Sequence, residues 1–180
     1  MSASTSQRSR FRQAVEGGLA TAVLMNGLNC LVFSQTPCIG TDRLGSCSVV
    51  LIVSPFAAIL AHIPPRPDDA DANDPEIGDK YVRSFMERVT TYYRQCQAYF
   101  PANSSSWVVC VVFGDAVALP DQQRIMERAL RDVGLTVDTS QTYRVPFTNN
   151  HRDRGTVFAD GRGHTIRVYV GNQGGPEYSL

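Results

Sequence analysis

Two short apolar runs on either side of a Ser-Pro pair constrain the fold of this chain more than any other feature. The first run is Ser48–Val53 and the second is Phe56–Ala61, with Ser54 and Pro55 between them. Short runs rich in β-branched and aliphatic residues that flank turn residues are typical of a β-hairpin. The sequence therefore predicts two neighbouring antiparallel strands in the middle of a buried core.

The hairpin would bring a thiol next to an imidazole. If the chain folds back at Ser54-Pro55, Cys47 lies opposite His62, because the numbers of opposed residues then sum to 109. Directly opposed residues share one face of the sheet, with Cβ atoms about 4.5 to 5.5 Å apart. Pro55 cannot adopt the positive φ that the tightest turns need, so a longer loop is expected. A slip of one residue would turn one of the two side chains to the other face.

Composition favours an ordinary globular domain. The chain has 180 residues, of which 43% are hydrophobic and 19% charged, and its formal net charge is zero. No basic field is present to attract nucleic acid or anionic lipid, so neither partner is expected. The first seven residues lack the apolar stretch of a secretory signal, which predicts a cytoplasmic protein. The most apolar stretch, residues 48–63, is interrupted and shorter than the roughly 20 residues that span a membrane. The oligomeric state is left open.

The cysteines favour neither disulfides nor a metal site. Their number is odd, they are scattered, and no two are spaced as Cys-x-x-Cys. We therefore expect reduced thiols, no metal and no cofactor. The five are Cys30, Cys38, Cys47, Cys96 and Cys110.

Periodicity along the rest of the chain predicts one α/β domain, a single-domain layered sandwich with a hairpin-rich, mostly antiparallel β core covered by two main helices. Residues 1–10 and 173–180 are expected to be disordered tails around a domain over residues 11–172. Residues 40–45 are expected to be a loop, and the proline-rich and acidic residues 65–75 an exposed loop. The two helices are expected over residues 76–98 and 121–133, and further strands over 28–33, 107–113, 135–145, 156–159 and 164–170.

Two segments resemble a known family. The stretch from Thr41 to Val49, which includes Leu-Gly-Ser-Cys, resembles the active-site segment of the CheD chemoreceptor glutamine deamidases, and Ala61–Pro64 resembles their histidine segment. The same Cys-His pattern is similar, more distantly, to that of the deamidase domain of cytotoxic necrotising factor toxins. The resemblance covers residues 28–170, and the chain departs from it at residues 56–60 and in the acidic loop 65–75.

The resemblance implies a role for three residues, and the oxyanion of such a reaction needs backbone donors from others. Cys47 would be the nucleophile, His62 the general base and Thr41 the group that holds the imidazole. Gly45 and Ser46, at the entry to the first strand of the hairpin, would supply backbone N–H groups to an oxyanion. A free thiol is mostly protonated at neutral pH, so a neighbouring base has to take its proton.

The implied activity is that of a cysteine-dependent glutamine amidohydrolase. Such an enzyme converts an exposed glutamine of a protein substrate to glutamate through a thioester, with release of ammonia. Two alternatives remain open at this stage. One is a small-molecule amidase or a transglutaminase-like acyl transfer, and the other is a non-catalytic binding module that retains the fold. The acidic loop 65–75 is expected to influence which target is chosen.

Overall fold

The two apolar runs form antiparallel strands at the centre of the protein, β4 (Ser48–Val53) and β5 (Ala57–Ile63). The computed structural model describes residues 9–145, 155–171 and 173–179, and only the backbone of the last range. Every residue of β4 and β5 is buried, which explains why both runs are continuously apolar rather than alternating. The predicted hairpin is confirmed.

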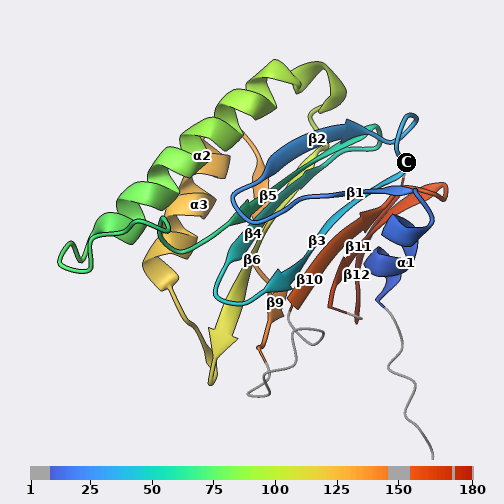
Figure 1. Cartoon of the computed structure of the whole chain (residues 1–180). Helices are drawn as coiled ribbons and strands as arrows, with labels where there is room; N and C mark the ends of the chain where they lie inside the picture. The colour runs from blue at the N-terminus through green and yellow to red at the C-terminus, as the bar shows by residue number, and fades with distance from the viewer. Residues whose placement is uncertain (1–8, 146–154, 172, 180) are drawn as a thin grey trace, which may run out of the picture.

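The strands form two sheets that stack face to face (Figure 1). One sheet has the order β2 (Leu28–Val32), β5, β4, β6 (Ser105–Phe113) and β7 (Ala116–Val117), and β8 (Thr136–Asp138) and β9 (Thr142–Tyr143) pair with β6 in parallel. The other sheet has the order β1 (Ala20–Ala22), β3 (Cys38–Leu44), β10 (Gly155–Asp160), β11 (Thr165–Val170) and β12 (Gln173–Ser179).

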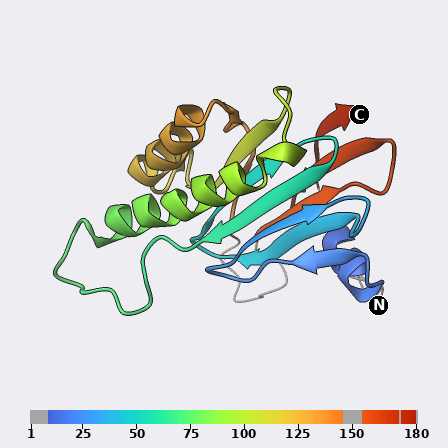
Figure 2. The same ribbon diagram turned by 90° about the horizontal axis from the view of Figure 1, so that it is seen from above.

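Helices cover the outer faces of both sheets, so the layers run helix, sheet, sheet, helix (Figures 1 and 2). α2 (Ile77–Gln95) and α3 (Pro120–Asp132) pack on the sheet that contains β4 and β5, and a 3-10 turn, η1 (Gln97–Tyr99), follows α2. α1 (Arg10–Glu16) packs on the sheet that contains β3. The predicted single-domain layered sandwich with two main helices and a mostly antiparallel core is confirmed.

The register of the hairpin differs from the expected one by two residues. Val49 pairs with His62 and Ser48 with Ile63, so that opposed numbers sum to 111. Ser54 stabilises the turn, because its hydroxyl accepts hydrogen bonds from the N–H groups of Phe56 and Ala57, each at 3.0 Å. A shift of two residues leaves every side chain on its expected face, since the side-chain period of a strand is two.

Three expectations are wrong. Residues 40–44 belong to β3 and are not a loop. Gly40 reads as a loop residue, but it is required in the strand because a Cβ there would lie 2.5 Å from a ring carbon of Phe11. The expected amino-terminal tail is too long, since α1 begins at Arg10 with Ser9 as its N-cap, while residues 1–8 lie outside the described residues. The expected tail over residues 173–180 is wrong for Gln173–Ser179, which form β12 against β11.

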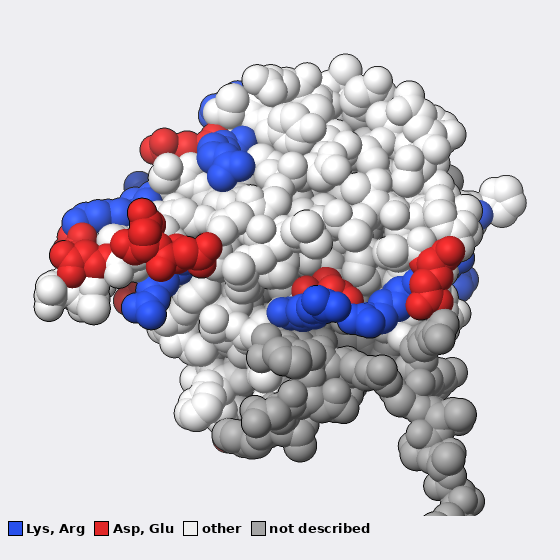
Figure 3. All heavy atoms as spheres, viewed as in Figure 1, with Lys and Arg blue, Asp and Glu red and all other residues white. Residues whose placement is uncertain are grey.

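The acidic loop is an exposed connection, as expected, and it joins β5 to α2. It begins directly after the strand that carries His62. Asp74 accepts a hydrogen bond from the N–H of Glu76 at 2.9 Å and pairs with Lys80, so it anchors the start of α2. Figure 3 shows acidic and basic side chains gathered over this edge of the molecule, beside a face that is mostly uncharged. No helix in the described ranges is both long and apolar enough to cross a bilayer.

Candidate active site

Cys47 and His62 point into the same space between the two sheets. Alternate residues of β4 and β5, among them Val49 and Leu60, pack in the core between the sheets, and Cys47 belongs to that core. His62 is two residues after Leu60 and pairs with Val49, and Cys47 is two residues before Val49. The two side chains are therefore diagonal neighbours on one face, a relation in which backbones are about 7 to 8 Å apart and long side chains make contact.

Thr41 reaches His62 from the opposite sheet. Its hydroxyl donates to the backbone oxygen of Val23 at 2.6 Å and lies 2.7 Å from Nδ1 of His62. A hydroxyl has one proton to donate, so the second bond requires Nδ1 to carry a hydrogen that Thr41 accepts. The hydrogen-bond geometry thus assigns the Nδ1–H tautomer to His62, with the lone pair on Nε2.

Nε2 is a base without a hydrogen bond. The atom is buried and has no partner among the described residues, in a side chain that is 3% exposed. Burial lowers the pKa of His62, while the Val23 carbonyl and the negative charge of Asp42 partly oppose this shift. His62 is therefore neutral at pH 7, which is the state that accepts a proton.

Cys47 is protonated at rest. Burial raises the pKa of its thiol from 9.0 to about 11, and the residue is 5% exposed. The two shifts favour a neutral thiol and a neutral imidazole over a thiolate–imidazolium pair, so the thiol ionises as its proton moves to a base. Because the described residues nearly close off the sulfur, a substrate has to displace side chains to reach it.

Tyr143 fixes the segment that leads into Cys47. Its hydroxyl donates to the backbone oxygen of Cys47 at 2.5 Å and lies 3.2 Å from that of Gly45, and its ring packs against Gly155, where a Cβ would clash. The Gly45 carbonyl and the Ser46 N–H belong to one planar trans peptide unit and point in opposite directions. Because the carbonyl points toward Tyr143, the N–H of Ser46 points away from it. Neither that N–H nor the N–H of Cys47 donates to a described residue.

The β1–β2 loop borders the site. The N–H of Asn26 donates to the backbone oxygen of His62, and the N–H of His62 donates to that of Gly27, each at 3.0 Å. Between these bonds and the Val23 carbonyl, the side chains of Leu24 and Met25 are 77% and 51% exposed. The loop therefore presents two apolar side chains to solvent beside the histidine.

A comparison with protein-family models and with curated proteins finds no match for this chain. The likeness to CheD deamidases therefore remains a prediction made from the residues quoted above.

Among the predicted site residues, Thr41 is hydrogen-bonded to His62, Cys47 lies on the same face of the hairpin as His62, and Gly45 and Ser46 form the bend before Cys47. Sequence reasoning missed Tyr143, which lies in a segment that had been interpreted only as a strand. It also missed Tyr81, whose hydroxyl donates to Asn26 Oδ1. Nothing in the spacing of either tyrosine could have indicated these contacts.

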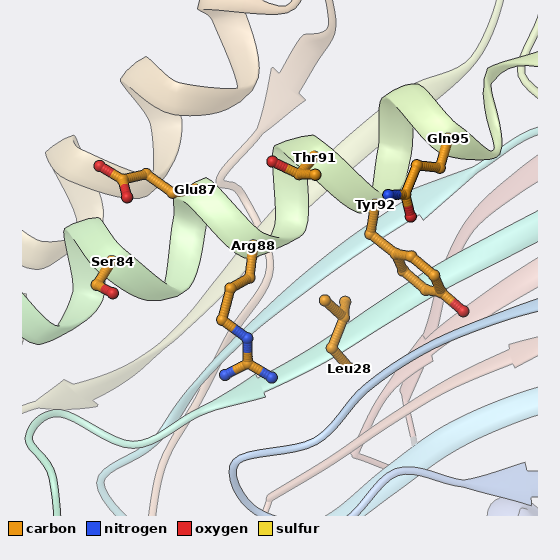
Figure 4. A pocket seen from close by; sticks show the side chains of 7 residues that line it. All are labelled: Leu28, Ser84, Glu87, Arg88, Thr91, Tyr92 and Gln95. Atoms are coloured by element: carbon orange, nitrogen blue, oxygen red, sulfur yellow. The ribbon is translucent and has the colours of Figure 1, made fainter.

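Two further findings bear on the function. Among the described residues, no three His, Cys, Asp or Glu side chains are grouped so as to hold a metal ion. A groove of about 550 Å³ lies on the opposite side of the β2–β5–β4 sheet, against α2 (Figure 4). Its lining includes Leu28, Arg88 and Tyr92 and none of the five predicted site residues.

Proposed function

We propose that this chain is a cysteine-dependent amidohydrolase that converts a glutamine side chain of a partner protein to glutamate. The observation that carries the proposal is the pair of hydrogen bonds made by Thr41. They hold the ring of a buried, neutral His62 and leave Nε2 without a partner among the described residues, in a side chain on the same face of the hairpin as Cys47. A base of fixed tautomer next to a neutral thiol suits general-base activation of a nucleophile.

The reaction follows from these groups. His62 Nε2 takes the thiol proton as the sulfur attacks the amide carbon, and the N–H groups of Ser46 and Cys47 stabilise the oxyanion of the tetrahedral adduct. One such donor is worth about 2.7 to 4 kcal/mol in the transition state. The imidazolium then protonates the leaving nitrogen, so ammonia departs and a thioester remains. Water, deprotonated by His62, hydrolyses the thioester to the carboxylate.

A protein-sized substrate is favoured by the rim of the site. Leu24 and Met25 offer an exposed apolar contact beside His62, where a small amide would have nothing to bury. On another side the acidic loop begins at residue 65, three residues after His62. We infer that this rim selects the segment that carries the glutamine.

A direct test uses a library of glutamine-containing proteins and peptides in ¹⁸O water. Deamidation adds one solvent oxygen and releases ammonia, whereas acyl transfer to an added amine adds the amine. We expect Cys47→Ser to fold normally and to abolish the mass change. The matched control is Cys110→Ser, since Cys110 is equally buried, its thiol pKa is also raised to about 11, and it lies on the helix-covered face. Wild-type turnover by Cys47→Ser would disprove the mechanism.

A second candidate, a non-catalytic binding module, is favoured by the burial of Cys47 and its raised thiol pKa. Alkylation by iodoacetamide at pH 7.5 separates the two functions. Cys47 and Cys110 share burial and pKa, so a module without base assistance should alkylate both at equal rates. General-base assistance by His62 should make Cys47 react about 100-fold faster. The advantage should vanish in His62→Asn, which keeps an N–H directed at Thr41 but has no basic nitrogen.

A further inference from the structure

His62 is the penultimate residue of β5, and the regular pairing of β5 with β2 ends one residue before it. The final pair of that ladder joins Leu28 to Ala61, whereas on the other side of β5 His62 still lies opposite Val49 of β4. After Ile63 the chain leaves the sheet for the exposed connection to α2. The proposed base therefore lies at the end of a strand, where local opening costs the least free energy.

A tight turn takes the place of a partner strand at His62. The turn runs from Leu24 to Gly27 and is closed by the N–H of Gly27, which donates to the carbonyl of Leu24 at 2.8 Å. The N–H of Asn26 donates to the backbone oxygen of His62, and the N–H of His62 donates to that of Gly27. Both backbone groups of the proposed base are thus bonded to this turn.

Asn26 has the backbone conformation and the side chain that this arrangement needs. Its φ is 66°, and asparagine is one of the few residues other than glycine that adopt a positive φ readily. Glycine would meet that requirement as well, but asparagine adds an acceptor, because the hydroxyl of Tyr81 donates to its Oδ1. Asn26 therefore bonds the backbone of His62 through its N–H and the helix α2 through its side chain.

Tyr81 reaches the turn from a rigid support. It lies near the start of α2, which extends along the sheet above β2 and β5 in Figure 1. Its ring packs edge-on against Phe85, with the ring centroids 6.1 Å apart, and on the core between α2 and the sheet. A tyrosine side chain has only two rotatable χ angles, so a packed ring fixes the position of its hydroxyl. The hydrogen bond to Asn26 therefore joins the turn to a helix that the core holds in place.

The turn follows directly on the residue that accepts the Thr41 hydroxyl. Val23 donates its N–H to the carbonyl of Gly40 at 2.8 Å, and its own carbonyl accepts the hydroxyl of Thr41. Val23 and Thr41 are therefore bound to β3, in one sheet, whereas the turn is bonded to the end of β5, in the other. A displacement of the turn would move the backbone of His62 relative to Thr41 and weaken the contact at Nδ1.

We propose that Tyr81 and Asn26 are positioning residues for His62, an inference that rests on the proposed function. Their hydrogen bond holds the turn against the end of β5 and thereby keeps Nδ1 of His62 at Thr41. Both residues act through the backbone of His62, and neither takes part in the proton transfer. Without this bond the turn and the end of β5 open more often, and the imidazole loses its fixed orientation while they are open.

Tyr81→Phe tests the contact, because it removes the hydroxyl and keeps the packed ring. Hydrogen exchange followed by NMR should show the amides of Asn26 and His62 exchanging about three- to tenfold faster, the factor expected for the loss of one neutral hydrogen bond. The amide of Leu60, inside the ladder with β2, should keep its rate.

The matched control is Tyr93→Phe in the same helix. The ring of Tyr93 packs on Phe100 with the centroids 5.5 Å apart, and its hydroxyl has no hydrogen-bond partner among the described residues. This substitution should leave the exchange of both amides unchanged.

A second variant tests whether Tyr81 acts through Asn26. Asn26→Gly keeps the N–H and the positive φ but removes the acceptor. If the hydrogen bond carries the effect, Tyr81→Phe should change the exchange of the His62 amide no further in the Asn26→Gly background.

Alkylation of Cys47 by iodoacetamide supplies a readout that a merely structural bond would not move. The rate of each variant is divided by its rate in the His62→Asn background, which cancels any change in access to the sulfur. This ratio measures the acceleration that His62 provides, and in Tyr81→Phe it should fall by about three- to tenfold.

The proposal is wrong if either the exchange of the His62 amide or this acceleration is the same in Tyr81→Phe as in Tyr93→Phe. It is also wrong if Tyr81→Phe and Asn26→Gly have independent effects. Such a result leaves the proposed function in place as long as His62→Asn alone slows the alkylation of Cys47. If His62→Asn does not slow it, the proposed function fails and the positioning role fails with it.

Discussion

Thr41→Val isolates the hydroxyl that orients His62, since valine keeps the shape of threonine and removes both hydrogen bonds. The change removes the hydroxyl from the Val23 carbonyl and from the Nδ1–H of His62, and leaves the Val23 carbonyl as the remaining neighbour of the ring, at residues 41 and 62 that are 1% and 3% exposed. Each buried polar group left unpaired costs about 1 to 3 kcal/mol. The removed hydroxyl no longer has to be desolvated, which offsets part of this cost. We expect the free energy of unfolding to fall by about 1 to 3 kcal/mol.

Urea unfolding measures this loss, with fluorescence of the single, buried Trp107 as the signal. The matched control is Thr90→Val in α2. The hydroxyl of Thr90 bonds only to a carbonyl of its own helix, that of Glu87 at 3.2 Å, so its removal should cost less than about 1 kcal/mol.

The tautomer gives a second readout. ¹⁵N chemical shifts of the His62 ring should report a protonated Nδ1 in the wild type and a mixture of tautomers in Thr41→Val. Alkylation of Cys47 should then slow by about tenfold, which corresponds to 1.4 kcal/mol of lost activation. If Thr41→Val is as stable as Thr90→Val, or if Nδ1 stays protonated in it, the hydroxyl does not orient the base and the proposed mechanism loses its support.

Three further predictions follow from the site. Burial lowers the pKa of His62, so below pH 6.5 the unfolded chain binds a proton at this residue more readily than the folded chain does. The free energy of unfolding should therefore fall as the pH drops below 6.5. This decrease should be smaller in His62→Asn, which lacks the titrating ring. Tyr143→Phe should lower stability by about 1 to 2 kcal/mol and slow alkylation of Cys47, whereas Tyr93→Phe, at a buried tyrosine of α2, should leave alkylation unchanged. Leu24→Asp should impair deamidation of proteins but not of a short glutamine amide; an equal effect on both would favour the small-molecule amidase.

The fold was predictable where local pattern and burial agree. The hairpin, both long helices and the buried strand β6 carry strong periodicity or continuous apolar runs, and each was located to within a few residues. β3 was not predictable, because Gly40 and Asp42 read as loop residues when their neighbours are unknown. At Gly40 there is no room for a Cβ, because the ring of Phe11 packs against it, and Asp42 forms a salt bridge with Arg12 at 2.9 Å. Phe11 and Arg12 both belong to α1, which is distant from β3 in the sequence.

The sequence predicts correctly that Cys47 and His62 lie on the same face of the hairpin, but it does not predict which residue lies opposite His62. The expected sum of 109 and the observed sum of 111 differ by one side-chain period, so the two groups remain on one face although they are diagonal rather than opposed. If the numbers of opposed residues summed to 110, the register would differ by one residue, and the imidazole would face the helices and not the second sheet. The turn decides between these cases, and it is set by the Ser54 hydroxyl, which bonds two N–H groups and also donates to the carbonyl of Tyr99 at 2.6 Å. That last partner could not have been identified from the sequence.

The state of the two reacting groups is a property of both sheets together. An isolated β4–β5 hairpin would leave Cys47 and His62 in water, with ordinary pKa values and no fixed tautomer. Stacking the second sheet buries both groups, which raises the pKa of the thiol, lowers that of the imidazole and places Thr41 against Nδ1. These shifts favour the uncharged pair at rest, so proton transfer has to be coupled to attack on the substrate. The proposed catalysis therefore depends on the packing of the two sheets, and a variant that loosens this packing should lose activity before it unfolds.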